Sequence, residues 1–248
     1  MKHKIWKLKP SPDAQKVFEL KKSLGVSKKI CALLIDRGID TFEKAKTFFR
    51  PQLSMLHDPF LMKDMDKAVS RLIKAVTSKE QIRVYGDYDV DGTTSVGMMY
   101  LFLKSQNANC DYYIPDRDTE GYGISYKGID SAIDKGISLM ICLDCGIKAV
   151  EKVAYAKSKG LDLIICDHHR PGEHLPDAIA VLDPKRVDCT YPFKELCGCG
   201  VGFKLIQAYL KHQGLDESMA FQYLDLVAVA IGADIVPIIE ENRVLAFY

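Results

Sequence analysis

Acidic and histidine residues directly follow three apolar segments of this sequence, QIRVYG, SLMICL and LDLIIC. Carboxylates and neutral imidazoles are ligands of divalent cations, and many carboxylates in one place repel one another unless a cation is present. If the three segments end at a common edge, these residues predict a metal site. They are Asp87, Asp89, Asp91, Asp144, Asp167, His168 and His169.

The first acidic cluster has two competing interpretations. Asp-x-Asp-x-Asp-Gly also begins an EF-hand calcium loop, but the twelfth position of such a loop is Met98, where a bidentate Glu is required. The cluster also follows a strand-like run, whereas an EF-hand loop follows a helix. A solvated turn would suit Asp and Gly, yet it leaves three alternating carboxylates at the end of a strand unexplained. Metal binding explains the pattern best.

His168 and His169 are adjacent, so their side chains diverge and both rarely bind one ion in the same way. We expect one to ligate through a neutral ring nitrogen and the other to orient a phosphate or donate a proton. Carboxylates together with an imidazole suit Mn²⁺ better than Mg²⁺. Two ions about 3.5–4 Å apart would bind both sides of a phosphodiester, and Asp144 is placed to bridge them.

Other signals for phosphate binding are weaker. The motif GxxxxGK[ST] is absent, and the first predicted strand leads into aspartates instead of GxGxxG. Gly198 and Gly200 precede a predicted helix, so their N–H groups could bind a phosphate, with simple flexibility at the helix entry as the alternative. Three cations in predicted loops could meet phosphates or be ordinary surface charges: Arg117, Arg170 and Lys185.

The elements that would position these residues alternate along the chain. Apolar strands of about six residues are separated by helices from residue 81 onward, which predicts βαβ units and an α/β fold with a mostly parallel sheet flanked by helices. The carboxyl ends of parallel strands meet at one edge, where ligands bind in open sheets. Short helices precede the strands, so we predict a helical N-terminal segment, 1–64, and a catalytic domain, 65–248.

The composition argues against several classes of protein. The 248 residues are 48% hydrophobic and 27% charged with a net charge of +1, which is unlike a disordered chain. No apolar run approaches the ~18 residues of a membrane span, and the N-terminus lacks a signal peptide's apolar stretch, so we expect a cytoplasmic protein. Residues 1–50 hold 13 Lys and Arg against 5 Asp and Glu, a basic segment that could contact phosphates or form a solvated face.

The eight cysteines read as reduced thiols in a cytosolic chain of this size. Cys142, Cys145 and Cys166 fall in or beside strand-like runs, where cysteine acts as a small hydrophobic residue. A zinc site formed by Cys142 and Cys145 with Cys197 and Cys199 is the alternative, although no CxxC pair repeats.

The motifs resemble the DHH phosphoesterase superfamily, which is named for the triplet present here as Asp167-His168-His169. Within that superfamily, the sequence is similar to the RecJ family of single-strand-specific DNA exonucleases. The resemblance covers essentially the whole chain, and its motifs occur in the same order. They are VYGDYDVDGTTS, YYIPDRDTEGYGIS, LDCG, ICDHHRPGEHLPDAIAVLDPK, LCGCGVGFKL and GADIVP.

The resemblance implies a nuclease with two Mn²⁺ or Mg²⁺ ions that removes nucleotides from single-stranded DNA, 5′→3′, in recombination and repair. It also implies single-strand-binding protein and a helicase as partners. Asp87 and Asp167 would support the metal cluster, and His169 would contact the scissile phosphate or assist as an acid. The implied metal ligands are Asp89, Asp91, Asp144, His168 and, through the resemblance alone, Asp234.

Two features depart from the family. Tyr85 stands where many relatives have His, which puts a further metal contact there in doubt. The family also continues into a DHHA1 domain and an OB-fold, so we expect a truncated piece that binds metal and degrades DNA weakly. The alternatives are a relative that hydrolyses short oligoribonucleotides or cyclic dinucleotides, and a non-catalytic module that binds nucleic acid.

Overall fold

The computed structural model describes residue 5 and residues 7–248. Its N-terminal unit, residues 1–52, contains three capped helices. Asp13, Ser27 and Thr41 each accept a hydrogen bond from an N–H group of the following first turn, which satisfies a donor that the helix leaves free. The helices are α1 (Ala14–Leu24), α2 (Lys28–Ile35) and α3 (Phe42–Phe49). Their small core consists of Leu20, Cys31, Leu34, Ile39 and Ala45.

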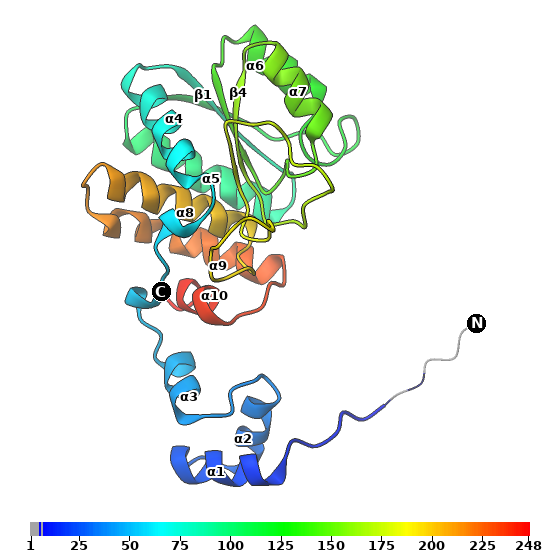
Figure 1. Ribbon diagram of the computed structural model, residues 1–248, viewed down its shortest axis with the longest axis vertical. Helices are drawn as coiled ribbons and strands as arrows, with labels where there is room; N and C mark the ends of the chain where they lie inside the picture. The colour runs from blue at the N-terminus through cyan, green and yellow to red at the C-terminus, as the bar shows by residue number, and fades with distance from the viewer. Residues whose placement is uncertain (1–4, 6) are drawn as a thin grey trace. The chain divides into compact units, whose positions relative to one another are not determined.

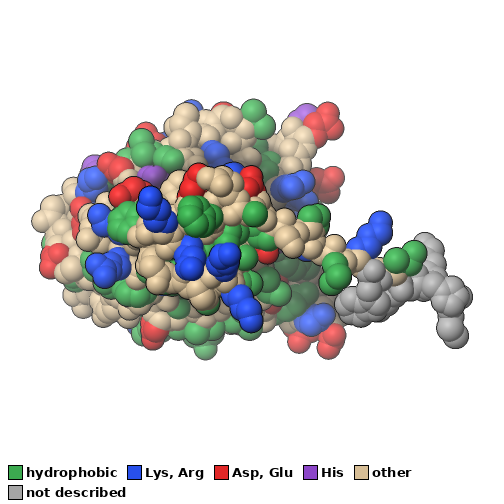
Figure 2. Space-filling model, turned by 90° about the horizontal axis from the view of Figure 1, so that it is seen from below, with side chains coloured by type: hydrophobic (Ala, Val, Ile, Leu, Met, Phe, Trp, Pro, Cys, Tyr) green, Lys and Arg blue, Asp and Glu red, His purple; other side chains and the backbone are tan. Residues whose placement is uncertain are grey.

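The surface of this unit carries the basic side chains that the sequence concentrates in residues 1–50. Lys16, Lys21, Lys28 and Lys46 are all exposed. Figure 2 looks onto this part of the chain and shows blue Lys and Arg side chains among green apolar ones. The unit is therefore a helical element with a cationic surface.

A five-stranded, wholly parallel sheet organises the second unit, residues 53–248, in the order β2-β1-β3-β4-β5. The strands are β1 (Gln81–Gly86), β2 (Asn109–Tyr113), β3 (Leu139–Leu143), β4 (Asp162–Cys166) and β5 (Ala180–Leu182). Apolar and β-branched residues fill β3 and β4 on both faces, as parallel strands between two helical layers require. The predicted α/β fold is confirmed.

Alternate residues of each strand enter one of two cores. Val84, Ile141 and Ile164 face the larger core, and Tyr85, Cys142 and Ile165 face the smaller one. The larger core is covered by α4 (Met65–Thr77), α5 (Val90–Ser105), α8 (Gly198–His212) and α9 (Leu224–Ala233). The smaller core is covered by α6 (Tyr126–Asp134) and α7 (Val150–Ser158), on the opposite side of the sheet in Figure 1.

The order in which the chain adds strands to the sheet reverses at β1. The connection through α5 leads from β1 to β2, and the connection through α6 returns past β1 to β3. Crossovers on opposite faces leave a crevice at the carboxyl ends of the strands between which the order reverses, here β1 and β3. This crevice is where the acidic segments meet.

Short elements complete the second unit. They are the 3-10 turns Leu53–Met55, Pro59–Leu61 and Glu217–Tyr223, and α10 (Glu240–Leu245) near the C-terminus in Figure 1. The break between the two units falls after Gln52, and α4 begins at Met65. No helix among the described residues has the length and apolarity needed to cross a bilayer.

Candidate metal centre

Four aspartates form a row along the carboxyl edge of the sheet. The last residues of β1, β3, β4 and β5 are paired in register, Gly86 with Leu143, Leu143 with Cys166 and Cys166 with Leu182. The next residue in each case is an aspartate, and each is almost completely buried. They are Asp87, Asp144, Asp167 and Asp183. The register of the sheet therefore gathers carboxylates from four separate parts of the chain.

The segment after β1 turns directly into α5. Asp89 caps that helix by accepting a hydrogen bond from the N–H group of Gly92 at 2.9 Å, and Asp91 lies in its first turn. A Cβ atom on Gly92 would come within 2.4 Å of the Asp87 carbonyl oxygen, so only glycine permits this tight start. Because residues 90–105 are helical, the calcium-loop interpretation is wrong.

Asp91 is buried against the N-terminus of α8. Its two carboxylate oxygens accept hydrogen bonds from the N–H groups of Gly198 at 2.6 Å and Cys199 at 2.7 Å. The positive end of the α8 dipole favours the carboxylate there. Burial nevertheless raises the pKa of Asp91 to about 6, and the neighbouring Asp234 and Asp89 carboxylates act in the same direction.

Asp144 has a backbone φ of 58°, a left-handed conformation that is unusual for a residue with a side chain. It is 1% exposed, and its Oδ1 atom has no hydrogen-bond partner. Burial raises its pKa to about 11, and Asp91 adds to the effect by repulsion. Strain and an unsatisfied buried carboxylate in one residue are typical of a functional site that needs a ligand.

His168 lies at the meeting point of three carboxylates. Its Nε2 atom is 3.3 Å from Oδ1 of Asp144, 3.6 Å from Oδ2 of Asp234 and 3.8 Å from Oδ2 of Asp91. Neither ring nitrogen makes a hydrogen bond, although the side chain is buried. Burial lowers the pKa of His168, which favours the neutral ring that binds metal ions.

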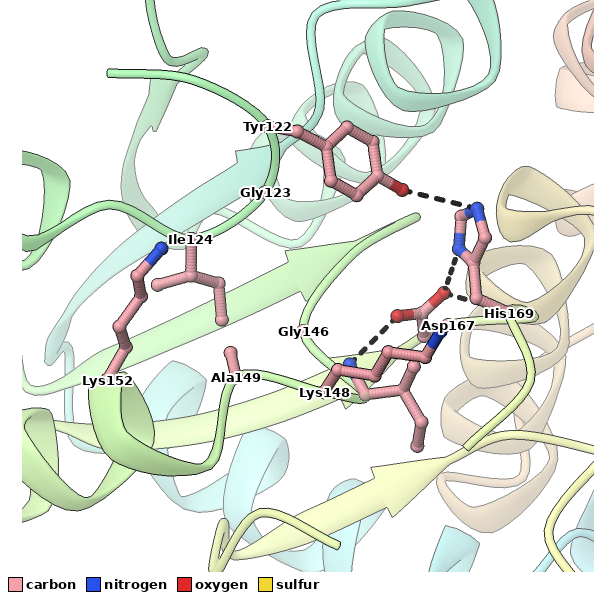
Figure 3. A pocket seen from close by; sticks show the side chains of 10 residues that line it. Tyr122, Gly123, Ile124, Gly146, Lys148, Ala149, Lys152, Asp167 and His169 are labelled. Atoms are coloured by element: carbon pink, nitrogen blue, oxygen red, sulfur yellow. Dashed lines mark hydrogen bonds and ion pairs between the residues drawn. The ribbon is translucent and has the colours of Figure 1, made fainter. Parts of the chain in front are cut away.

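His169 is held in a different way from its neighbour. Its Nδ1 atom is 2.7 Å from Oδ1 of Asp167, and its Nε2 atom is 3.2 Å from the Tyr122 hydroxyl, as Figure 3 shows. The hydrogen bond to Asp167 raises the pKa of His169. Burial acts to raise the pKa of Asp167, but hydrogen bonds from His169 and from backbone N–H groups outweigh it and lower that pKa. The pair is therefore a carboxylate that orients an imidazole and stabilises its charged form.

These donors fit divalent cations. Two groups of side chains have ligand atoms within 4.8 Å of one another: Asp144 with His168 and His169, and Asp91 with His168 and Asp234. The unpartnered Asp144 and His168 atoms face each other in a buried site, where hydrogen bonding alone leaves them unsatisfied. A carboxylate and imidazole donor set of this kind suits Mn²⁺ or Mg²⁺. No cysteine of the described residues joins either group, so the zinc interpretation gains no support.

Residues 81–231, the segment that carries most of this geometry, match the DHH family, N-terminal domain. The chain belongs to the DHH family. Its triplet Asp167-His168-His169 follows β4, where one histidine enters the carboxylate cluster and the other pairs with the aspartate.

Several similar proteins are RecJ exonucleases. The single-stranded-DNA-specific exonuclease RecJ of Bacillus subtilis is 44% identical over 235 residues, which cover 95% of this chain and 29% of that protein. RecJ of Escherichia coli is 39% identical over 193 residues, covering 74% of this chain and 33% of that protein. This DHH-family chain thus spans about a third of the length of these relatives.

Solved structures of the same kind also superpose. The crystal structure of RecJ in complex with Mn²⁺ from Thermus thermophilus has a TM-score of 0.76 at 27% identity, covering 95% of this chain and 33% of that one. The structure of exonuclease RecJ bound to manganese has a TM-score of 0.70 at 31% identity, covering 79% of this chain and 48% of that one. The sequence resemblance to RecJ exonucleases is confirmed.

Of the predicted metal ligands, Asp89 alone lies outside both groups of ligand atoms among the described residues. Asp89 is exposed and caps α5, and its charge acts on Asp91 and Asp144 from nearby. Asp234 follows α9, with a side chain that is 31% exposed. Asp87 is buried, and its Oδ1 atom accepts from the N–H group of Gly123 at 3.3 Å. Their roles in metal binding and catalysis stay predictions.

The predicted phosphate contacts fall into two kinds, glycine N–H groups that are already bonded within the protein and arginines that are exposed. The N–H groups of Gly198 and Gly200 donate to Asp91 and to Sγ of Cys197, so both already have protein acceptors. A Cβ on Gly198 would approach Oδ1 of Asp144 to 2.6 Å, which gives this glycine a steric role that the sequence did not suggest. Arg117 is exposed, with its guanidinium 5.3 Å from the ring centre of Tyr88 beside the acidic loop. Arg170 is exposed directly after the DHH triplet.

Two residues of this edge were not singled out from the sequence. Asp183 follows β5 in the same row as the other aspartates, and the signal was available, because it ends an apolar run as they do. Burial raises its pKa to about 7, and its Oδ2 atom has no hydrogen-bond partner. Tyr122 lies in the glycine-bearing loop before α6, and no spacing in the sequence connects it to His169.

Proposed function

We propose that this chain carries the catalytic centre of a metal-dependent phosphodiesterase that removes nucleotides from single-stranded DNA in the 5′→3′ direction. The observation that carries the proposal is His168, whose unpartnered Nε2 atom faces carboxylates from β3, α5 and the end of α9. Membership of the DHH family and the likeness to RecJ exonucleases supply the substrate class. Residues 65–248 form the catalytic domain in this proposal, and residues 1–64 a helical segment.

Two Mn²⁺ or Mg²⁺ ions would be held by Asp89, Asp91, Asp144, His168 and Asp234. When bound, the ions would activate a water molecule and stabilise charge on the phosphoryl oxygens. The α8 N–H groups fix the orientation of the Asp91 carboxylate. Gly198 lets Asp144 lie directly against the first turn of α8.

Asp167 and His169 supply a proton at the edge of this centre. The carboxylate of Asp167 holds Nδ1 of His169, which leaves Nε2 directed outward beside the Tyr122 hydroxyl. Since Asp167 raises the pKa of His169, a larger share of this ring is imidazolium than in a free histidine, and the imidazolium can contact the scissile phosphate or protonate the leaving oxygen. Buried Asp87, whose pKa is raised by burial, supports the cluster from β1.

The surroundings of the centre agree with a strand of DNA as substrate. Arg117 and Arg170 lie exposed beside the acidic loop and the DHH triplet, where they would meet phosphates. The basic surface of α1–α3 would add non-specific attraction. Single-strand-binding protein and a helicase stay predictions from the resemblance, and a cytoplasmic location stays a prediction from the sequence.

A direct assay tests the proposal. A 5′-labelled single-stranded oligonucleotide is incubated with the protein and Mn²⁺, with EDTA and a fully duplex oligonucleotide as controls. We expect labelled mononucleotide to be released only from the single strand and only with metal. A 3′-labelled strand, which should retain its label until late in the reaction, reports the polarity.

The same assay separates the alternatives. Hydrolysis of RNA of two to five nucleotides or of cyclic dinucleotides, with no cleavage of DNA, would assign an oligonucleotide phosphodiesterase instead. Metal-independent binding of single strands without cleavage would assign a non-catalytic binding module. Either result would overturn the exonuclease proposal.

A further inference from the structure

A cavity of about 230 Å³ adjoins His169 on the side of the smaller core. Its walls are the loop Tyr122–Ile124, the loop between β3 and α7, and the start of α7. In Figure 3, Tyr122 lies above this cavity, His169 at its right, Lys148 below it and Lys152 at its left. The metal centre described above makes no use of these two lysines.

Neither lysine has an anionic partner. Among the described residues, no carboxylate pairs with Lys148 or Lys152, although Lys152 is partly buried at the start of a helix. Lys148 is exposed. Two unpaired ammonium groups that line one cavity favour an anion there, because a cleft lined by one sign of charge concentrates ions of the other sign. Lys157 on the same helix, by contrast, pairs with Asp177.

The one acidic residue that lines the cavity does not oppose an anion. The Oδ1 atom of Asp167 accepts from the N–H groups of His168 and His169 and from Nδ1 of His169. Its Oδ2 atom accepts from the N–H group of Ile147 at 2.9 Å. These donors offset the charge of Asp167, and Lys148 and Lys152 are the cationic side chains that line the cavity beside His169.

The start of α7 adds free N–H donors, and the Glu151 carboxylate in its first turn lies outside the cavity lining. Ala149 is its N-cap residue and makes no side-chain capping hydrogen bond, so the N–H groups of the first turn lack the acceptor that Ser, Thr or Asp would supply. Ala149 and Lys152 line the cavity, which places this helix end beside it. An uncapped helix N-terminus attracts anions through its dipole and its free N–H groups.

The size and the lining of the cavity indicate what kind of molecule carries the anion. Ile124, Ile147 and Ala149 give the cavity an apolar side opposite its cationic one. Its volume lies below the ~300 Å³ at which pockets for whole small molecules begin, so it suits one phosphate with its sugar. We propose that this cavity binds the phosphate and deoxyribose of the nucleotide next to the scissile bond, with Lys148 and Lys152 as the phosphate contacts. The inference rests on the proposed exonuclease function for its substrate class.

The test compares the double variant Lys148→Gln/Lys152→Gln with Lys157→Gln, which removes the same type of charge from α7 outside the cavity. Binding of thymidine 5′-monophosphate and of thymidine is followed by NMR titration in EDTA, so that the metal centre contributes nothing. We expect the monophosphate to bind the wild type at least 5-fold more tightly than thymidine does, and the double variant to lose that preference. Lys157→Gln should keep it, and unchanged thermal unfolding would show that all three proteins fold.

Cleavage kinetics supply a second, independent measurement. With Mn²⁺ and single-stranded DNA, the double variant should raise KM at least 5-fold with kcat changed less than 2-fold. The slope of log KM against log salt should become shallower by about 0.7, which is the contribution of one phosphate contact on a single strand. Lys157→Gln should match the wild type in all three quantities.

The outcomes separate this inference from the proposed function. A wild type that cleaves no DNA but binds the monophosphate in a lysine-dependent way would overturn the exonuclease and leave the cavity assignment standing. A wild type that cleaves DNA, with the same KM and the same phosphate preference in the double variant, would overturn the cavity assignment alone. Equal binding of thymidine and its monophosphate by the wild type would also overturn it.

Discussion

Unsatisfied polar atoms mark the metal centre at the scale of single residues. Most buried polar atoms in proteins have a hydrogen-bond partner, yet Oδ1 of Asp144 and both ring nitrogens of His168 have none. The two side chains face each other at 3.3 Å. Such an arrangement costs folding free energy unless a cation joins the two ligands. Neutralising the carboxylate should therefore lower the activity of the protein but not its stability without metal.

Asp144→Asn tests that relation. Asn tolerates the left-handed backbone at this position, so the change removes charge without added strain. We expect metal-dependent cleavage to fall at least ~10²-fold, because even the outer partners of metal ligands contribute about 10- to 100-fold. In EDTA the melting temperature should stay the same or rise. The measurements are single-strand cleavage and thermal unfolding with and without Mn²⁺.

Asp134→Asn, an exposed site on α6, is the matched control and should alter neither quantity. Retained turnover in Asp144→Asn would contradict the assignment of this carboxylate as a bridging ligand.

Asp183 should make stability depend on pH. Its pKa is raised by burial to about 7 from an ordinary value of 3.8, so folding disfavours the ionised form. The wild type should therefore lose stability as pH rises from about 4 to about 7, by on the order of 4 kcal/mol from this group, and change no further above that range. The Asn side chain of Asp183→Asn cannot ionise, so the free energy of unfolding of this variant should depend less on pH over the same interval.

Urea unfolding in EDTA at half-unit steps of pH from 4 to 8 measures this difference. Parallel curves for Asp183→Asn and the wild type would show that Asp183 ionises as freely in the folded chain as in the unfolded one.

At the scale of elements, the N-terminus of α8 packs closely against the end of β3. Two N–H groups of its first turn bind Asp91, and Gly198 has no side chain to separate it from Asp144. The geometry of both carboxylates thus depends on how closely one helix end approaches the sheet.

Gly198→Ala should disturb this approach. The new Cβ would lie 2.5 Å from Cβ of Asp144, which forces the helix or the strand end to move. We expect a loss of about 1–3 kcal/mol in the free energy of unfolding and a loss of cleavage of at least 10-fold. Gly97→Ala in the interior of α5 has open space around it and should stabilise the protein slightly. Full activity in Gly198→Ala would contradict the steric role of this glycine.

The sequence predicted the sheet and its acidic edge because strand periodicity and terminal aspartates are local patterns. Asp183 also follows an apolar strand, so the same pattern could have predicted it. The contacts that orient the ligands were out of reach, since the hydrogen bonds of Asp91 to α8 join residues more than a hundred positions apart. The short elements were out of reach as well, since neither the 3-10 segment that precedes α9 nor α10 was predicted from the sequence.

At the scale of the whole molecule, one buried ion pair joins segments that lie far apart in sequence. Lys204 on α8 is 0% exposed and donates to Glu241 on α10 at 2.6 Å and to the carbonyl oxygen of His57 at 3.1 Å. The Glu241 carboxylate also accepts from the N–H group of His57 and from the Tyr191 hydroxyl. This network fixes the chain on both sides of the segment that carries Asp234.

Glu241→Gln should therefore be far more damaging than the loss of an exposed pair. It leaves the Lys204 ammonium buried without a counter-charge, which costs about 3–5 kcal/mol, whereas replacing both partners by apolar residues is often neutral. We expect Lys204→Met/Glu241→Leu to recover at least half of that loss in urea unfolding. Lys211→Met, which breaks an exposed pair between the same helix and Asp58, should cost less than about 1 kcal/mol. If Glu241→Gln costs no more than Lys211→Met, the buried pair does not hold these segments together, and the position of Asp234 must depend on the packing of α9 alone.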